Sequence, residues 1–165
     1  MCNLDQGLAT YQKINQKLWQ KIEHGSPRTP LFERRFALTG QKLGFTWDGP
    51  QLEKQYRQLL DHNFRILPGA DRLLKNLRKN HKTLIAASNG VQTTQIQRLV
   101  GSGLRQYFDQ VFISENSGFA KPGPRFFTPL YQSYPHLSSK NAILIGDRLP
   151  FDILGACRVS LSSVW

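Results

Sequence analysis

The stretch Leu84-Ile85-Ala86-Ala87-Ser88-Asn89-Gly90 guides the interpretation of the whole chain. Its first four residues are apolar without alternation, which is typical of a strand buried on both faces of a parallel sheet. Its last three residues are small and polar, at the point where the strand is expected to end. Because parallel α/β sheets bind ligands at the carboxyl ends of their strands, we expect these polar residues to lie at a binding site.

Three further apolar runs follow, and segments with helical spacing separate the runs from one another. Such alternation predicts right-handed βαβ crossovers and a parallel sheet covered on both faces. Pro129 is predicted either to kink the third helix of this region or to begin a second segment with Thr128. The predicted strands are 84–87, 111–113, 142–145 and 163–165.

The residues before Leu67-Pro68-Gly69 show helical spacing and no strand signal. Thr29 is the predicted N-cap of the second helix, with Pro30 in the first helical position. The change of pattern predicts two domains, a helical one over residues 1–65 and an α/β one over residues 66–165.

Each of three predicted strand ends carries a group suited to a phosphate or to Mg²⁺. Ser88 offers a hydroxyl near backbone amides at a helix start, although a simple N-cap would use the same residue. Lys121 stands beside a proline in a loop and could neutralise a phosphate, although most loop lysines are merely exposed. Asp147 and Asp152 could supply oxygen ligands to Mg²⁺, or could instead be an N-cap and a first-turn charge.

Taken together, the three strand ends favour one phosphate-and-magnesium site over three unrelated coincidences. We therefore expect Ser88, Lys121 and Asp147 to converge at the carboxyl ends of the strands. These residues resemble the second, third and fourth motifs of the haloacid dehalogenase-like phosphohydrolases, and the similarity covers nearly the whole chain. The quoted motifs are Leu84–Gly90, Ile113–Pro122 and Gly146–Asp152.

The resemblance implies a Rossmann-like phosphohydrolase core over residues 66–165 and a helical cap over residues 1–65. It implies a phosphomonoester hydrolase that uses Mg²⁺ and acts on a small phosphorylated metabolite or nucleotide. The stretch Tyr11–Gly25 is similar to the pyrimidine 5′-nucleotidase branch, which implies nucleoside monophosphates as substrates. The residue roles that it implies are phosphate binding by Ser88, Asn89 and Lys121, catalysis by Lys121, and metal binding by Asp147 and Asp152.

The sequence departs from the family pattern at both ends, so both domains are expected to be partial. No apolar strand ending in Asp-x-Asp-x-Thr precedes the first helix, and Asp5 has too few residues before it to replace the nucleophile. The resemblance places the missing strand between strands 84–87 and 142–145, so we expect these two strands to flank a gap or to pair only imperfectly. We also expect the chain as given to be inactive. The chain also stops at Val164-Trp165, where the family continues. The alternative function is a non-catalytic remnant that binds phosphate or Mg²⁺.

The composition adds a strong positive charge, with 22 Lys and Arg against 11 Asp and Glu. This charge attracts anions, and it leaves open a third function as a basic nucleic-acid-binding protein. Because the basic residues are scattered over predicted polar helix faces, we do not favour nucleic acid as the partner. No apolar run is long enough for a membrane span, no signal peptide is visible, and the two cysteines are not spaced as metal ligands. We expect a cytoplasmic protein, and nothing in the sequence specifies an oligomeric state.

Overall fold

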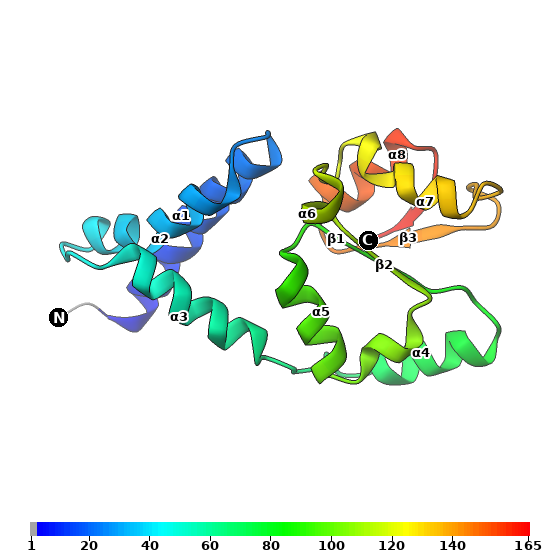
Figure 1. Ribbon diagram of the computed structural model, residues 1–165, viewed down its shortest axis with the longest axis horizontal. Coiled ribbons are helices and arrows are strands. Elements are labelled where there is room, and N and C mark those ends of the chain that lie inside the picture. Colours follow the sequence, from blue (N-terminus) through cyan, green and yellow to red (C-terminus); the bar gives the residue numbers. More distant parts are fainter. Residues whose placement is uncertain (1–2) are drawn as a thin grey trace. The chain divides into compact units, whose positions relative to one another are not determined.

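The computed structural model describes residues 3–165. They divide into two compact units, one that ends at Leu60 and one that spans Asp61–Trp165 (Figure 1). The helical unit is built by α1 (Leu4–Glu23), α2 (Arg28–Lys42) and most of α3 (Gly49–Asp61). The second unit alternates helices with strands, and its elements are α4 (Ala70–Lys79), β1 (Ile85–Ser88), α5 (Gln92–Gly101), η1 (Leu104–Tyr107), β2 (Gln110–Ile113), α6 (Ser114–Ser117), η2 (Pro124–Phe127), α7 (Thr128–Ser133), β3 (Ile143–Ile145), η3 (Leu149–Ile153), α8 (Leu154–Arg158) and β4 (Ser162–Val164).

The start of α2 corrects the predicted N-cap. The helix begins at Arg28, and Pro27 takes the N-cap position with φ −57° and no side-chain capping bond. Thr29 and Pro30 therefore lie within the first turn. Proline is tolerated there because the N–H groups of the first turn have no helical acceptor in any case.

A buried ion pair organises the helical unit. The Arg35 guanidinium donates to both carboxylate oxygens of Glu53, at 2.5 and 2.9 Å, and both side chains are 5% exposed. Its carbon lies 4.6 Å from the ring centroids of Phe32 and Tyr56, so aromatic faces cover the charge. Asn15 accepts a further hydrogen bond from Arg35. Each of the three guanidinium nitrogens thus donates a hydrogen bond, and hydrogen bonding of this kind is the condition under which a buried charge is tolerated.

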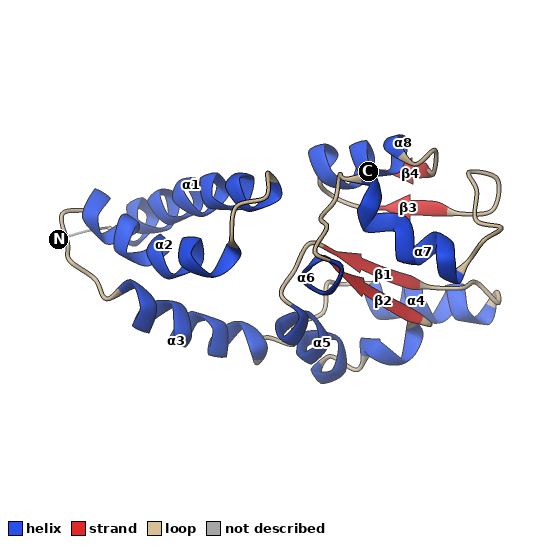
Figure 2. Ribbon diagram, turned by 45° about the horizontal axis from the view of Figure 1, so that its top comes forward, coloured by secondary structure: helices blue, strands red, loops and turns tan. Residues whose placement is uncertain are grey.

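The strands form two separate parallel pairs (Figure 2). β1 pairs with β2 from Ile85↔Gln110 to Ser88↔Ile113, and β3 pairs with β4. The four strands lie where the sequence predicts them, with ends shifted by a residue. β1 and β3 do not pair, so the expectation that these two strands flank a gap or pair only imperfectly is confirmed.

One apolar cluster covers a single face of both strand pairs. It consists of buried Phe126 and Phe127 of η2 and Leu130 of α7, against which Ile85, Ala87, Phe112 and Leu144 pack. α7 begins at Thr128, so Pro129 belongs to a new segment and does not kink a longer helix. The predicted burial of both faces is wrong for β3, since Ile143 and Ile145 are 56% and 68% exposed.

Two remaining features concern single residues and the membrane. Cys157 is exposed and free, and the cysteine at position 2 lies outside the described residues. None of the helices formed by residues 3–165 combines the length and the apolar character that a bilayer span requires.

Candidate active site

Lys121 is the centre of the candidate site. It lies between α6 and η2, and it is only 7% exposed, so it is not an ordinary loop lysine. Its Nζ donates to the Ala87 carbonyl of β1 at 2.8 Å and to Oδ1 of Asp152 at 2.6 Å. Two bonds of this length fix the position of the ammonium group. A fixed positive charge therefore stands at the carboxyl end of β1.

Asp152 is buried in η3 and both of its carboxylate oxygens are engaged. Oδ1 accepts from Lys121, and Oδ2 accepts from the Arg148 N–H at 3.1 Å. Gly146 lies against this carboxylate, because a Cβ built on Gly146 would stand 2.4 Å from Cγ of Asp152. A glycine directly after β3 is thus what allows Asp152 to approach the strand end.

Asn89 holds the backbone of Lys121. Its side-chain amide donates to the Lys121 carbonyl, and its Oδ1 accepts from the Lys121 N–H, both at 2.8 Å. This two-point contact places the lysine opposite the end of β1. The predicted role of Asn89 in phosphate binding stays a prediction, while its positioning role is visible only in three dimensions.

Ser88 is the last residue of β1 and is partly buried. Its hydroxyl makes no hydrogen bond within residues 3–165, so it is available to an incoming ligand. The alternative that Ser88 is merely an N-cap is wrong, because α5 begins at Gln92 and Val91 occupies the N-cap position. Ser88 therefore stays a predicted phosphate ligand.

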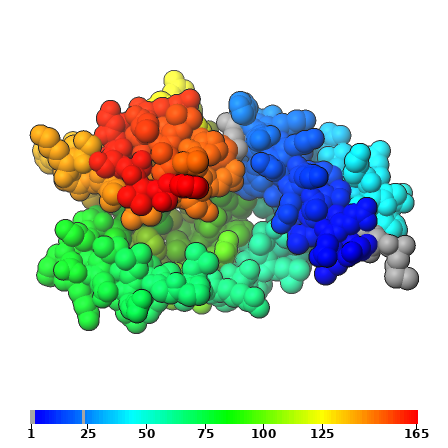
Figure 3. All heavy atoms as spheres, turned by 180° about the vertical axis from the view of Figure 1, so that it is seen from behind, coloured from blue at the N-terminus to red at the C-terminus, as the bar shows by residue number. Residues whose placement is uncertain are grey.

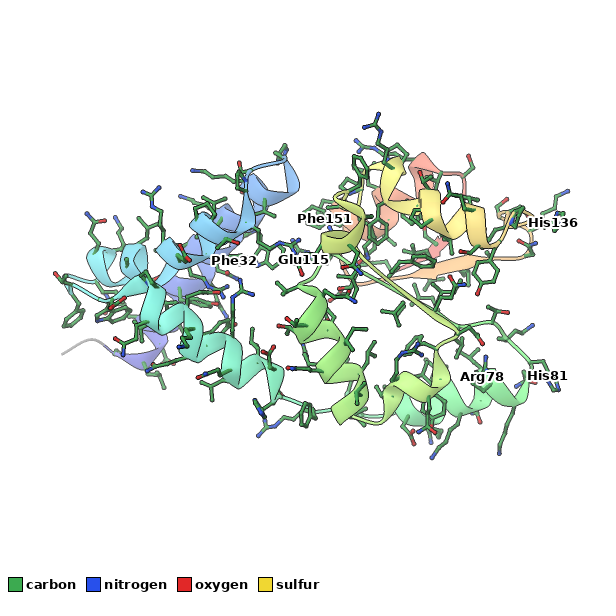
Figure 4. The ribbon with its side chains drawn as sticks, viewed as in Figure 1. Phe32, Arg78, His81, Glu115, His136 and Phe151 are labelled. Atoms are coloured by element: carbon green, nitrogen blue, oxygen red, sulfur yellow. The ribbon has the colours of Figure 1, made fainter. Side chains whose placement is uncertain are left out.

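The amino end of α5 already binds an anionic side chain. Oε2 of Glu115 accepts from the Gln92 N–H at 2.7 Å, and Figure 4 labels Glu115 beside the loop that leads to α5. The first helical amide is therefore taken by a carboxylate. The sequence predicts an anion site at this helix start. Its Ser88 hydroxyl remains available to a ligand, but the Gln92 amide does not.

Asp147 differs from Asp152 in exposure and in contacts. It is exposed, and its recorded contact is through the backbone, where its carbonyl accepts from Nε1 of Trp165 at 3.1 Å. The side chain of the neighbouring Arg148 stacks on the ring of Phe151, 4.4 Å from the centroid, and Figure 4 shows Phe151 near this end of the unit. The structure thus brings Lys121 into direct contact with Asn89 and Asp152, while the Asp147 side chain makes no hydrogen bond or ion pair with these three residues.

The carboxylates that this chain supplies do not fit a complete magnesium site. Mg²⁺ requires near-octahedral oxygen coordination and is usually held by one or two carboxylates together with phosphate oxygens and waters. Asp152 has both oxygens in hydrogen bonds, which leaves Asp147 as the open carboxylate. In the described part of the chain, no three acidic, histidine or cysteine side chains gather as metal ligands. Metal binding by Asp147 and Asp152 therefore stays a prediction.

Asp109 has a structural role, at the opposite end of the strands from Lys121, that the sequence did not predict. Asp109 precedes β2, and its Oδ2 accepts from the Leu84 N–H and from Nη1 of Arg78, both at 2.8 Å. These bonds, first the one from the Leu84 backbone, hold the pKa of Asp109 below its ordinary value. Asp109 thus ties the amino end of β1 to α4 and plays no part in the site around Lys121.

Comparison with protein families gives a match over nearly the whole chain. Residues 10–165 match the model of the haloacid dehalogenase-like hydrolases. The chain is 35% identical over 158 residues to the HAD-hydrolase YfnB of Bacillus subtilis, and this match covers 95% of the chain and 67% of YfnB. It is 33% identical to the pyrimidine 5′-nucleotidase PynA of Streptococcus pneumoniae and 31% identical to the pyrimidine 5′-nucleotidase YjjG of Escherichia coli. Each of those two matches covers 94% of the chain, and they cover 66% of PynA and 68% of YjjG.

Solved structures of similar proteins have the same fold as this chain. The crystal structure of magnesium-bound YfnB superposes with a TM-score of 0.92 at 34% identity, over 100% of this chain and 74% of that chain. The L-2-haloacid dehalogenase of Xanthobacter autotrophicus gives a TM-score of 0.73 at 19% identity, which is a likeness of fold alone. The chain spans about two thirds of the length of the curated relatives that it matches.

Proposed function

Because the chain belongs to the haloacid dehalogenase-like hydrolase family, we propose that it is the phosphate-binding part of a phosphomonoester hydrolase. In this proposal the unit from Asp61 to Trp165 is the core and the helical unit that ends at Leu60 is the cap. The proposed boundary lies within a few residues of the one expected from the sequence. The proposed substrates are nucleoside monophosphates, on the ground that two relatives are named pyrimidine 5′-nucleotidases.

The buried ammonium of Lys121 is the single observation that carries the proposal. A lysine with its Nζ fixed by the Ala87 carbonyl and by Asp152 does not need to be ordered when an anion arrives. A positive charge held in advance is the kind of group that stabilises phosphate oxygens most effectively. In this proposal Lys121 faces the phosphate, and the hydroxyl of Ser88 donates a hydrogen bond to one of its oxygens.

Asn89 and Asp152 act through Lys121 in this proposal. Asn89 fixes the lysine backbone, and Asp152 holds the ammonium group at the strand end through its hydrogen bond. We derive no step through a metal ion, because the carboxylates of this chain do not complete a magnesium site.

The 165 residues contain no Asp-x-Asp pair. We therefore propose that this polypeptide by itself binds a phosphate group without hydrolysing its ester. None of the polar groups described above is a free carboxylate beside Lys121, and a phosphohydrolase of this family needs one for covalent attack. A non-catalytic phosphate binder, the alternative function, is favoured by the same observation.

The test compares binding and turnover in the purified 165-residue chain. We expect inorganic phosphate and uridine monophosphate to bind in calorimetry, with no release of phosphate above background from the nucleotide or from p-nitrophenyl phosphate with Mg²⁺. Lys121→Met should weaken phosphate binding about 10- to 100-fold, since a hydrogen bond to a charged group contributes roughly 1.5–3 kcal/mol. Lys75→Met on the exposed surface of α4 is the matched control and should bind as the parent does.

Two results would contradict the proposal. Equal phosphate affinity of the Lys121→Met chain, with its circular dichroism unchanged, would show that the lysine does not bind the ligand. Turnover that depends on Mg²⁺ and disappears in the Lys121→Met chain would show that another residue of this chain supplies the nucleophile.

A further inference from the structure

The guanidinium of Arg148 is a positive charge that has no anionic partner within residues 3–165. Arg148 lies in the short segment between β3 and η3, and its side chain is exposed. The guanidinium makes no hydrogen bond and no ion pair with the described part of the chain. All of its N–H donors are therefore open to a ligand.

The aromatic ring of Phe151 holds this guanidinium in place. The guanidinium carbon of Arg148 lies 4.4 Å from the centroid of the ring. The Phe151 N–H donates to the Arg148 carbonyl at 3.0 Å, so a single backbone turn brings the two side chains together. Because an arginine that stacks on a ring keeps its N–H edge free, the contact with Phe151 orients the donors without using them.

Arg148 belongs to the same group of contacts as Lys121. The Arg148 backbone N–H donates to Oδ2 of Asp152 at 3.1 Å, and Nζ of Lys121 donates to Oδ1 at 2.6 Å. A single carboxylate thus lies between the Arg148 backbone and the Lys121 ammonium. Figure 4 shows Phe151 at the same end of the α/β unit as Glu115, which follows the carboxyl end of β2. The stacked guanidinium is therefore at the end of the strands where a phosphate is proposed to bind.

The segment around Arg148 is open to solvent. Asp147, Arg148 and Leu149 are exposed, and Figure 3 shows the orange-to-red residues that follow β3 on the surface of the unit. Because the guanidinium has no hydrogen bond or ion pair, a phosphate group that reaches it breaks no existing bond of that kind.

The charges of the Lys121 network and of the segment after β3 balance without a metal ion. Asp147 and Asp152 each contribute one negative charge, and Lys121 and Arg148 each contribute one positive charge. With a neutral residue at position 148, the same set would carry a net negative charge, which repels a phosphate. Glu115 lies at this end too, but the amino end of α5 takes up its charge through a backbone N–H. Arg148 thus offsets the exposed Asp147 carboxylate, which a bound cation would otherwise have to do.

We propose that Arg148 is an anion ligand of the candidate site, and that its guanidinium supplies the second positive charge for a bound phosphate group in place of a divalent cation. This inference rests on the proposed phosphate-binding function. A guanidinium donates paired, parallel hydrogen bonds to the oxygens of a phosphate, whereas the Lys121 ammonium acts as a point charge. Phosphate binding by this chain is then independent of Mg²⁺.

The open groups of the site suit Mg²⁺ less well than they suit a phosphate. Asp152 has both oxygens in hydrogen bonds, so Asp147 is the open carboxylate. A lone carboxylate beside an arginine is a poor site for a divalent cation, because the guanidinium and the cation repel each other. Arg148 therefore favours a phosphate and disfavours a divalent cation at the same place.

The test measures the binding of inorganic phosphate to the purified 165-residue chain by calorimetry, once with a chelator and once with Mg²⁺. We expect the same dissociation constant under both conditions. Arg148→Gln should weaken phosphate binding about 10- to 100-fold in the presence of the chelator, as expected for loss of hydrogen bonds to a charged group. The matched control is Arg105→Gln, which makes the same charge change in η1, before the amino end of β2, and should bind as the parent does.

A second variant tests the orientation of the guanidinium. Phe151→Leu keeps Arg148 and removes the ring on which its guanidinium stacks. It should weaken phosphate binding about two- to fivefold, the effect of losing a cation–π contact at an exposed site. Circular dichroism of each variant should match that of the parent, because Arg148 is exposed and Phe151 is outside the buried cluster.

Lys121→Met separates this inference from the proposed function. Phosphate binding that depends on Lys121 but is unchanged in Arg148→Gln would leave the proposed function standing and overturn the inference. Phosphate binding by the parent that requires Mg²⁺ would also overturn the inference alone. A parent chain that binds no phosphate with or without Mg²⁺ would overturn both.

Discussion

The ion pair between Lys121 and Asp152 is the contact whose removal tests the site most directly. The two side chains are 8% and 9% exposed, and Nζ lies 2.6 Å from Oδ1. Asp152→Leu leaves a buried ammonium that donates to the Ala87 carbonyl and lies over the Phe126 ring but has no carboxylate partner, and Lys121→Met leaves a buried carboxylate. Breaking one side of a buried pair costs about 3–5 kcal/mol, whereas replacing both partners by apolar residues of similar volume is often close to neutral.

These values predict that the effects of the two substitutions on stability are strongly non-additive in a double-mutant cycle. Each single variant should lose about 3–5 kcal/mol of unfolding free energy, and the variant with both changes should lose far less than the two losses combined. Urea unfolding at pH 7, followed by far-ultraviolet circular dichroism, measures all four proteins. The matched control is Lys75→Met in the exposed Asp71–Lys75 pair of α4, which should barely move the urea midpoint because such pairs contribute little. Additive losses in the cycle would refute the contact between Lys121 and Asp152.

Three further outcomes are expected. Phe127→Ala, in a side chain that is 1% exposed, should cost about 3–5 kcal/mol in urea unfolding, as for other buried phenylalanines; a loss below about 1 kcal/mol would contradict its central place in the cluster. Gly146→Ala should displace Asp152, because the new Cβ would stand 2.4 Å from its carboxylate carbon. Nuclear magnetic resonance should therefore show shifted Asp152 signals in this variant. Unchanged Asp152 signals would contradict the close approach of Gly146 to the carboxylate. The pKa of Asp109 is lowered from 3.8 on folding, so its stabilising effect is complete above that value and is lost as the pH falls through the folded pKa. The stability difference between the parent and Asp109→Asn should therefore stay constant from pH 6 to about pH 4 and shrink as the pH falls further. A difference that does not change below about pH 4 would argue against this role of Asp109.

The strands were predictable from the sequence because each is a short apolar run bounded by polar residues. The gap between β1 and β3 was predictable as well, from the similarity to a family whose sheet has a strand between these two. The start of α2 was not predictable, because Thr29-Pro30 has the pattern of an N-cap followed by a first helical residue. Pro27, the actual N-cap, has no side chain that could signal this position. The exposure of Ile143 and Ile145 was missed because an apolar run is read as buried on both faces, and the run alone does not show which neighbours are present.

The sequence predicts candidate site residues but not the network of contacts that they form. Ser88, Lys121 and the two aspartates stand at strand ends, which the order of elements reveals. The contacts of Asn89 and Asp152 with Lys121 join residues that are 32 and 31 positions apart in the chain, and no local pattern announces such a pairing. An asparagine after a strand and an aspartate two residues after a proline have many other uses, so their positioning roles emerge only from the fold.

The division of the strands into two pairs has a consequence for the order in which the α/β unit folds. β1 pairs with the next strand along the chain, and so does β3, so each pair closes only a short loop. Contacts of low sequence separation form early and quickly. The apolar cluster of η2 and α7, which stands between the pairs in the chain, is then what joins them. During synthesis the β1–β2 pair leaves the ribosome before β3 and β4 exist, so it can form first and offer a ready surface on which the later pair assembles.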